Sequence, residues 1–127
     1  MVQSEDVEIL ERRAAEDLRA AEILLDSDDE LMAQVGFLLQ QYIEKRMKAS
    51  LQKHDIEYPK THDLVMLLKL FPNKGVCVDD KIFAHVLSRF AVESRYGAFS
   101  TPPLDGQQML EKTKKFAELI ETLWGNA

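Results

Sequence analysis

The sequence predicts an all-α fold, in which residues 1–127 form a single domain of packed helices. Several segments repeat apolar residues at spacings of three and four, the period of an amphipathic helix. No segment keeps a period of two, as a half-buried strand would, and no strand alternates with a helix as in the α/β class. A chain of 127 residues is of single-domain length and buries enough surface to fold without disulfides or metals.

The first helix is predicted from Ser4 to Leu25. Its apolar positions form one stripe: Val7, Leu10, Ala14, Leu18, Ala21 and Leu25. Ser4 suits an N-cap, and the acidic residues that follow it suit the positive end of the helix dipole. The polar run at residues 26–29 ends this helix and begins the next.

The second helix is predicted from Glu30 to Lys53. Apolar residues cover most of its circumference, which is typical of a helix buried on more than one side. This helix is therefore either the centre of the bundle or also meets a second copy of the chain. Gly36 lies inside it, where glycine costs about 1 kcal/mol relative to alanine. Close approach of another helix would explain a residue without a side chain at this position.

A loop is predicted at residues 54–61, because Pro59 disfavours helical angles in the residue before it. Thr61 stands where an N-cap belongs, before a short third helix whose apolar face runs from Leu64 to Phe71. The segment 72–75 ends this helix.

Two further helices complete the predicted bundle. The fourth restarts at Asp79 and Asp80 and has apolar residues on one side. The last begins near Asp105 and runs to Trp124, after a loop at residues 97–106 that contains two prolines. The first, second and last helices are the long ones.

The charge distribution argues against a general DNA-binding protein. The net charge is −6. Residues 1–30 carry 11 acids and 3 bases, whereas the rest of the chain has a slight basic excess. No signal peptide and no apolar run long enough to span a bilayer is visible, so we expect a cytoplasmic protein without membrane attachment.

Known cofactor and metal motifs are not found in the sequence. The 5 glycines are scattered, which excludes a phosphate loop or a dinucleotide fingerprint. The 3 histidines do not have metal-binding spacing, and Cys77 is the single cysteine, which excludes a multi-cysteine zinc site. We therefore expect no metal and no cofactor.

A polar cluster on the second helix is the first candidate site. Gln41, Glu44, Lys45 and Lys48 recur at spacings of three and four and therefore share a face. Bases outnumber acids from residue 44 to residue 62. These side chains either form a functional pocket, or Glu44 pairs with one base and the lysines are solvated.

The stretch Pro59–Leu64 extends this cluster. With Thr61 as the N-cap, His62 and Asp63 would occupy the first turn of the third helix, where Asp63 is stabilising. Lys60 and His62 then either point outward toward an anion, or His62 is a hydrogen-bonded residue that anchors the loop to the second helix. No nucleophile accompanies these residues, so we predict no catalytic residue among them.

Three segments in order resemble the HEPN domain, the helical partner of minimal nucleotidyltransferases in prokaryotes. They are QYIEKRMKASL at residues 41–51, PKTHDLVMLL at residues 59–68 and ESRYGAF at residues 93–99. The resemblance covers essentially the whole chain. It implies an up-and-down bundle of four to five helices and, usually, a two-fold homodimer.

The resemblance also implies a function. Some members of the family are toxins that cleave RNA without metal, using an arginine followed after four to six residues by a histidine. No arginine here has a histidine at that spacing; Arg46 and His54 are separated by seven residues. We therefore expect a non-catalytic module that binds a nucleotide or a nucleotidyltransferase partner. The alternative is a toxin-type RNase with a divergent active site that uses His62 or His54 with Arg95.

The predicted site combines both lines of argument. The expected ligand-binding residues are Lys45, Lys48, Lys60, His62, Arg95 and Tyr96. The expected supporting residues are Gln41, Glu44, Thr61 and Asp63.

Overall fold

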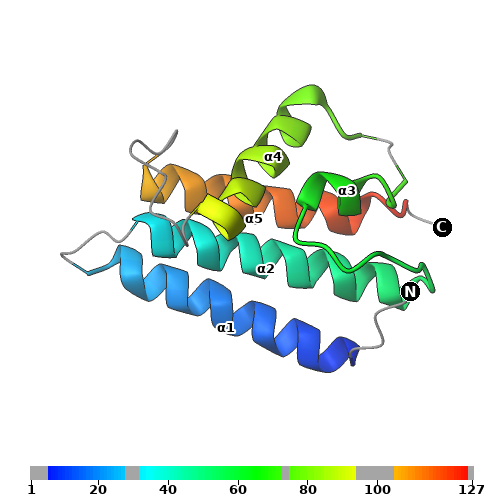
Figure 1. Cartoon of the computed structure of the whole chain (residues 1–127), viewed down its shortest axis with the longest axis horizontal. Coiled ribbons are helices and arrows are strands. Elements are labelled where there is room, and N and C mark those ends of the chain that lie inside the picture. Colours follow the sequence, from blue (N-terminus) through cyan, green and yellow to red (C-terminus); the bar gives the residue numbers. More distant parts are fainter. Residues whose placement is uncertain (1–5, 28–31, 73–74, 94–104, 126–127) are drawn as a thin grey trace.

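The computed structural model describes residues 6–27, 32–72, 75–93 and 105–125. Within these ranges the chain forms five α-helices and no strand (Figure 1). The helices are α1 (Val7–Leu25), α2 (Met32–Lys53), α3 (Leu64–Leu68), α4 (Val78–Glu93) and α5 (Gly106–Thr122). The predicted all-α bundle is confirmed.

Helix α2 is the centre of the bundle and contacts each of the other four helices. In Figure 1, α1 and α5 lie along α2, and α4 stands across it with the short α3 beside it. The four long helices reverse direction from one to the next, so the bundle is of the up-and-down type. The wide apolar circumference of α2 is therefore explained by contacts within one chain.

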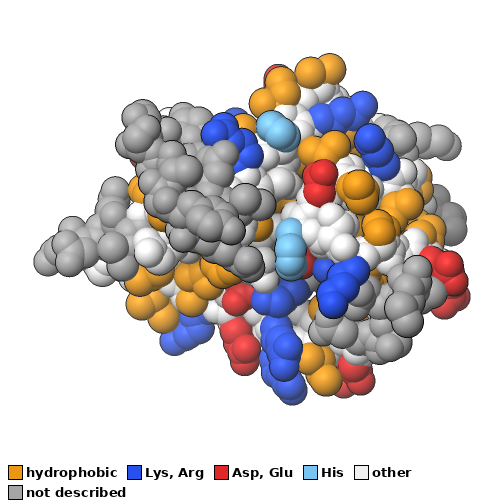
Figure 2. All heavy atoms as spheres, in the orientation of Figure 1, with side chains coloured by type: hydrophobic (Ala, Val, Ile, Leu, Met, Phe, Trp, Pro, Cys, Tyr) orange, Lys and Arg blue, Asp and Glu red, His pale blue; other side chains and the backbone are white. Residues whose placement is uncertain are grey.

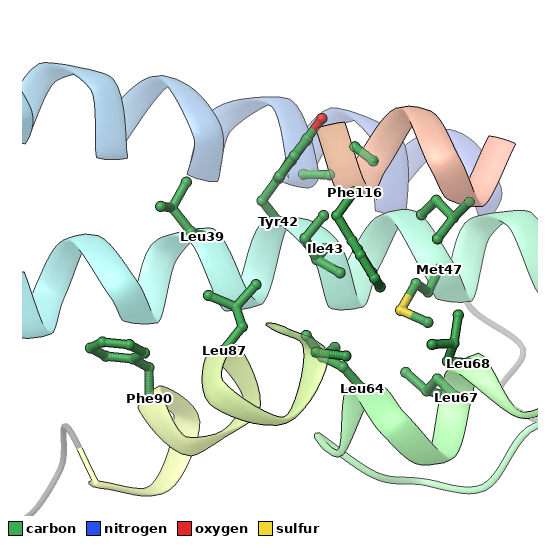
Figure 3. Close-up of a cluster of buried hydrophobic side chains, with 14 of the residues drawn as sticks. Leu39, Tyr42, Ile43, Met47, Leu64, Leu67, Leu68, Leu87, Phe90 and Phe116 are labelled. Carbon is green, nitrogen blue, oxygen red and sulfur yellow. The ribbon is translucent and has the colours of Figure 1, made fainter. Parts of the chain in front are cut away.

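The core gathers around the middle of α2. Figure 3 shows Ile43 and Met47 of α2 among side chains of α3, α4 and α5, with Leu39 one turn before them on α2. These three residues are fully buried, as are Leu87 and Phe90 of α4. The core thus brings α4 and α3 onto the same side of α2, which positions the loop between α2 and α3 next to α4.

Helix α1 begins after Asp6, whose carboxylate accepts a hydrogen bond from the backbone N–H of Glu8 at 2.7 Å. The predicted cap, Ser4, lies outside the described residues.

The acidic side of α1 is matched by lysines of the neighbouring helices. Among the described residues, three ion pairs join them: Lys45 with Asp17, Lys53 with Glu11, and Lys114 with Glu22.

The predicted cap of α3 is wrong, because Asp63 rather than Thr61 is its N-cap. The Asp63 carboxylate accepts from the backbone N–H groups of Val65 at 2.9 Å and Met66 at 3.4 Å. Thr61 Oγ1 instead accepts from the backbone N–H of Asp63 at 3.0 Å and closes a turn in the loop. Since a carboxylate reaches two orphan amides, the helix starts later than predicted. His62 therefore lies in the loop and not in the first turn.

Helix α5 begins as the sequence predicts. Asp105 is its N-cap and forms a capping box with Gln108. Beyond the end of α5, the ring of Trp124 stacks on His54 with centroids 3.7 Å apart, and its Nε1 donates to Ser50 Oγ at 2.7 Å. His54 thus helps to hold the C-terminal part of the chain against the end of α2.

Among the described residues, no helix is both long and apolar enough to cross a bilayer.

Candidate functional site

Glu44 is the centre of a buried polar network on α2. Its Oε2 accepts from Nζ of Lys48 at 3.0 Å, and its Oε1 accepts from Nε2 of Gln40 at 3.0 Å. Nδ1 of His62 lies 2.9 Å from the same Oε1. Nε2 of Gln40 also donates to the backbone oxygen of His62 at 3.0 Å. The loop before α3 is therefore joined to α2 through both the side chain and the main chain of His62.

The protonation state of Glu44 follows from these contacts. Burial raises the pKa of Glu44, and this is the largest single effect. It is outweighed by the effects that lower the pKa, which are the hydrogen bond from Gln40, the charge of Lys48 and the hydrogen bonds from His62 and Lys48. The net result is a pKa below its ordinary value, so Glu44 is ionised at neutral pH. A carboxylate can only accept, and hence Nδ1 of His62 is the donor. The imidazole Nε2 is left for other partners, and the His62 side chain is 62% exposed.

The structure shows what the two predicted lysines of α2 contact. Lys48 is buried against Glu44, and its Nζ lies 5.9 Å from the ring centroid of Tyr58. Lys45 forms an ion pair with Asp17 of α1. Both lysines thus already have a carboxylate partner within the chain. One interpretation of the sequence was that Glu44 pairs with a base and the lysines are solvated. The structure agrees with the ion pair, but Lys48 is buried and not solvated.

Gln40 is a member of the network that sequence reasoning missed. The spacing of Gln40, Glu44 and Lys48 places all three on one face of α2, on the side that packs inward. Gln41, the predicted member, lies beside them and donates from Nε2 to Oε1 of Gln40 at 2.7 Å. The spacing of four between the polar residues Gln40, Glu44 and Lys48 was the signal available in the sequence.

The loop residues Lys60, Thr61 and His62 form a wall shared by two surface hollows. The hollow on the α2 side has a volume of about 230 Å³. Besides the shared wall, it is lined by Leu10, Arg13, Gln41, Glu44, Lys45 and Lys48. The hollow on the α4 side has a volume of about 530 Å³. Besides the shared wall, it is lined by Asp63, His85, Ser88 and Arg89.

Figure 2 shows histidine and cationic side chains on one face of the molecule, over α4 and between α4 and α1. The α2-side hollow contains most of the predicted site residues. Four of the predicted ligand-binding residues meet there: Lys45, Lys48, Lys60 and His62. The predicted supporting residues Gln41, Glu44 and Thr61 line the same hollow, and Asp63 lines the other. Arg95 and Tyr96, which were also predicted, lie outside the described residues.

Three lining residues from α4 were not predicted. His85, Ser88 and Arg89 share one side of that helix at spacings of three and four. Ser88 has a structural role, since its Oγ accepts from the backbone N–H of Leu64 at 2.9 Å and donates to the backbone oxygen of Ala84 at 2.8 Å. This contact joins the start of α3 to α4 and fixes the α4 side of the wall.

Both hollows are lined by cationic side chains and histidine together with one carboxylate, Glu44 in one hollow and Asp63 in the other. Ammonium, guanidinium and imidazole N–H groups are donors suited to phosphate oxygens. The exposed Nε2 of His62 can also exchange a proton with a bound group. In the part of the chain that the structure describes, no three metal-ligating side chains lie close enough together to hold a metal ion.

The comparison with protein families identifies the fold. A search of curated proteins and a search of solved structures each find no match to this chain. The family model of the HEPN domain matches residues 7–123, nearly the whole chain. Of the three sequence segments that resembled this family, the first lies on α2, and the second contains the wall between the two hollows and α3. The third begins at Glu93, the last residue of α4, and its other residues lie outside the described part of the chain. The chain therefore belongs to the HEPN domain family.

Proposed function

We propose that this protein is a non-catalytic HEPN module that binds the phosphate groups of a nucleotide at the wall formed by Lys60, Thr61 and His62. The observation that carries this proposal is the position of that wall between two hollows, both of which contain cationic side chains. The internal hydrogen bonds support it as well. Glu44 and Gln40 hold His62 from one side, and Ser88 holds Leu64 from the other, so the wall needs little reorganisation on binding.

The proposal includes two partners, a second copy of the chain and a nucleotidyltransferase. The segments shared with the HEPN family support both, since proteins of this family pair with such enzymes and usually dimerise. Sedimentation velocity of the chain alone, and with the product of a neighbouring nucleotidyltransferase gene, measures each association separately.

Replacement of Lys60 by alanine is expected to weaken binding of ATP about tenfold. A charged hydrogen bond contributes about 1.5–3 kcal/mol, and each 1.4 kcal/mol is tenfold in affinity. Isothermal titration calorimetry of wild type and Lys60→Ala with ATP measures this difference.

The matched control is Lys115→Ala. Lys115 is an exposed lysine of α5 that lines neither hollow, so its removal changes the net charge equally without touching the site. Equal losses in both variants would mean a general charge effect, and an unchanged affinity in Lys60→Ala would reject the wall as the binding site.

A metal-independent RNase is the second candidate, and the orientation of His62 favours it. Glu44 accepts from Nδ1 and so presents Nε2 of His62 to solvent, as a carboxylate does for a general base. Nε2 would take the proton of a ribose 2′-hydroxyl, whose oxygen attacks the adjacent phosphorus. The 5′-oxygen leaves with a proton from a second acid, giving a cyclic phosphate and a 5′-hydroxyl.

Incubation with labelled RNA in chelator separates the two functions. A non-catalytic module is expected to leave the RNA intact. Cleavage by wild type that is lost in His62→Ala would establish the RNase. His54→Ala is the control, because His54 stacks on Trp124 and lines neither hollow. Cleavage that survives in His62→Ala would come from a contaminant or another site.

A further inference from the structure

The two lysines of α2 in the α2-side hollow already form ion pairs within the chain. Nζ of Lys48 lies 3.0 Å from Oε2 of Glu44, and Lys45 forms an ion pair with Asp17 of α1. Among the described residues that line this hollow, Glu44 is the one carboxylate. A bound anion would compete with the two carboxylates for these lysines, and breaking a buried ion pair is costly. Lys45 and Lys48 are therefore poor phosphate ligands.

Two other cations line the same hollow, Arg13 of α1 and Lys60 of the loop before α3. Both side chains are exposed. Within the described ranges, neither side chain forms a hydrogen bond or an ion pair. Asp17, one turn after Arg13 on α1, pairs with Lys45 of α2 instead. The hollow thus has two unmatched positive charges, and they come from two separate elements.

The packing of α1 explains the position of Arg13. Leu10 is three residues before it and therefore lies on the same side of the helix. Leu10 is buried, and it also lines the hollow. Arg12, two residues after Leu10, lies on a different side of α1 and lines neither hollow. The buried side of α1 therefore places Arg13, and not Arg12, at the edge of the hollow.

We propose that Arg13 is a phosphate ligand of this protein and that, together with Lys60, it holds one phosphoryl group in the α2-side hollow. The inference rests on the proposed function and adds α1 to the site. At about 230 Å³, this hollow is smaller than the roughly 300–1,000 Å³ of sites that enclose a whole small molecule. It therefore has room for the phosphoryl end of a nucleotide, and the rest of the nucleotide lies outside it.

The charges define the chemical class of the ligand. A terminal phosphate group carries about −1.5 to −2 charges at neutral pH, whereas each phosphodiester carries about −1. The guanidinium of Arg13 can form two parallel hydrogen bonds with a phosphate, and the ammonium of Lys60 supplies the second positive charge. Neutral His62 adds no donor, because its Nδ1 already donates to Glu44 and its Nε2 is then an acceptor. The site therefore fits a phosphomonoester better than the diester backbone of RNA.

Adenosine monophosphate (AMP) and its cyclic 3′,5′-diester are matched probes, because they share base and ribose and differ in the charge of the phosphate. In calorimetric titrations, wild type is expected to bind AMP at least about tenfold more tightly than the cyclic diester. Arg13→Ala is expected to lose about tenfold in AMP affinity and less in affinity for the diester, so the preference narrows. Arg13→Lys, which keeps the charge without the planar guanidinium, is expected to recover part of the loss.

Arg12→Ala is the matched control, because it removes the same charge from the neighbouring position of α1. It is expected to change AMP affinity less than twofold. Equal losses in Arg12→Ala and Arg13→Ala would indicate a general charge effect and overturn the proposal. Wild type that does not bind AMP, or that binds the cyclic diester as tightly, would overturn it too. Both arginines are exposed, so the circular dichroism melting curves of the variants are expected to match that of wild type.

The same titrations separate this inference from the proposed function. If AMP affinity falls in Lys60→Ala but not in Arg13→Ala, the wall binds the nucleotide and the assignment of Arg13 is overturned. If inorganic phosphate binds as tightly as AMP and its binding depends on Arg13, the phosphate site stands and the nucleotide assignment fails.

Discussion

Glu44→Gln is expected to lower the free energy of unfolding by about 3–5 kcal/mol, the usual cost of removing one partner of a buried ion pair. Glu44 is 5% exposed and accepts hydrogen bonds from Gln40, Lys48 and His62. The variant leaves the ammonium of Lys48 buried without its counter-charge. Urea denaturation at neutral pH measures the difference.

Two comparisons make this prediction specific. Glu118→Gln changes an exposed acid of α5, and a surface change of this kind is expected to stay within about 0.5 kcal/mol. Combining Glu44→Gln with Lys48→Met removes both charges, so the double variant is expected to lose less than the sum of the single losses. If Glu44→Gln costs less than about 1 kcal/mol, the network is not the structural centre described above.

The pH dependence follows from the direction of the Glu44 pKa shift. Its folded-state pKa is lower than the ordinary value of 4.5, so its contribution to stability is fully present above that value. The contribution is lost as the pH falls through the lower folded-state value. The gap in stability between wild type and Glu44→Gln should therefore narrow below about pH 4.5 and stay constant above it. A gap that widens on acidification would contradict the ionised state of Glu44.

The helices could be predicted from the sequence because their signals are local. The stripe on α1, the apolar circumference of α2 and the cap at Asp105 each depend on residues within one helix or next to it. The cap of α3 was wrong for a local reason too. Thr61 and Asp63 both suit an N-cap, and only the positions of the backbone amides decide between them.

The site could be predicted only in part, because its members meet through tertiary contacts. The three family segments indicated Lys60 and His62 correctly as neighbours of Lys48, since the loop returns along α2. Nothing local in the sequence linked His85 and Arg89 to that loop. Their position depends on Phe90 and Leu87, which pack α4 into the core, and on the hydrogen bond from Leu64 to Ser88. The sequence also could not show that Lys45 would face Asp17, which belongs to α1.

Gly36 shows how α4 reaches its position above α2. A Cβ atom built on Gly36 would overlap the ring of Phe90, and that ring is fully buried. The close approach of another helix, one explanation for this glycine in the sequence, is thus made by α4. The contact places the half of α4 that contains Arg89 against α2.

Gly36→Ala is accordingly expected to lower the free energy of unfolding by about 1–3 kcal/mol, the usual cost of overpacking a core. This outcome is the opposite of the gain of about 1 kcal/mol that alanine brings to an exposed helix position. Chemical denaturation of the variant measures the sign directly. If Gly36→Ala is as stable as wild type or more stable, the packing of Phe90 on Gly36 is not as close as described.

Gly106→Ala is the matched control for this prediction. A Cβ atom at Gly106 would meet the end of the Leu25 side chain, which is partly exposed and can rotate away, whereas the Phe90 ring is enclosed. We therefore expect Gly106→Ala to cost less than Gly36→Ala. Adding Phe90→Leu to Gly36→Ala should give a double variant that loses less than the sum of the single losses, since the smaller side chain leaves room for the new methyl group. If the losses in the free energy of unfolding are additive, the strain in Gly36→Ala does not arise at the contact between α2 and α4.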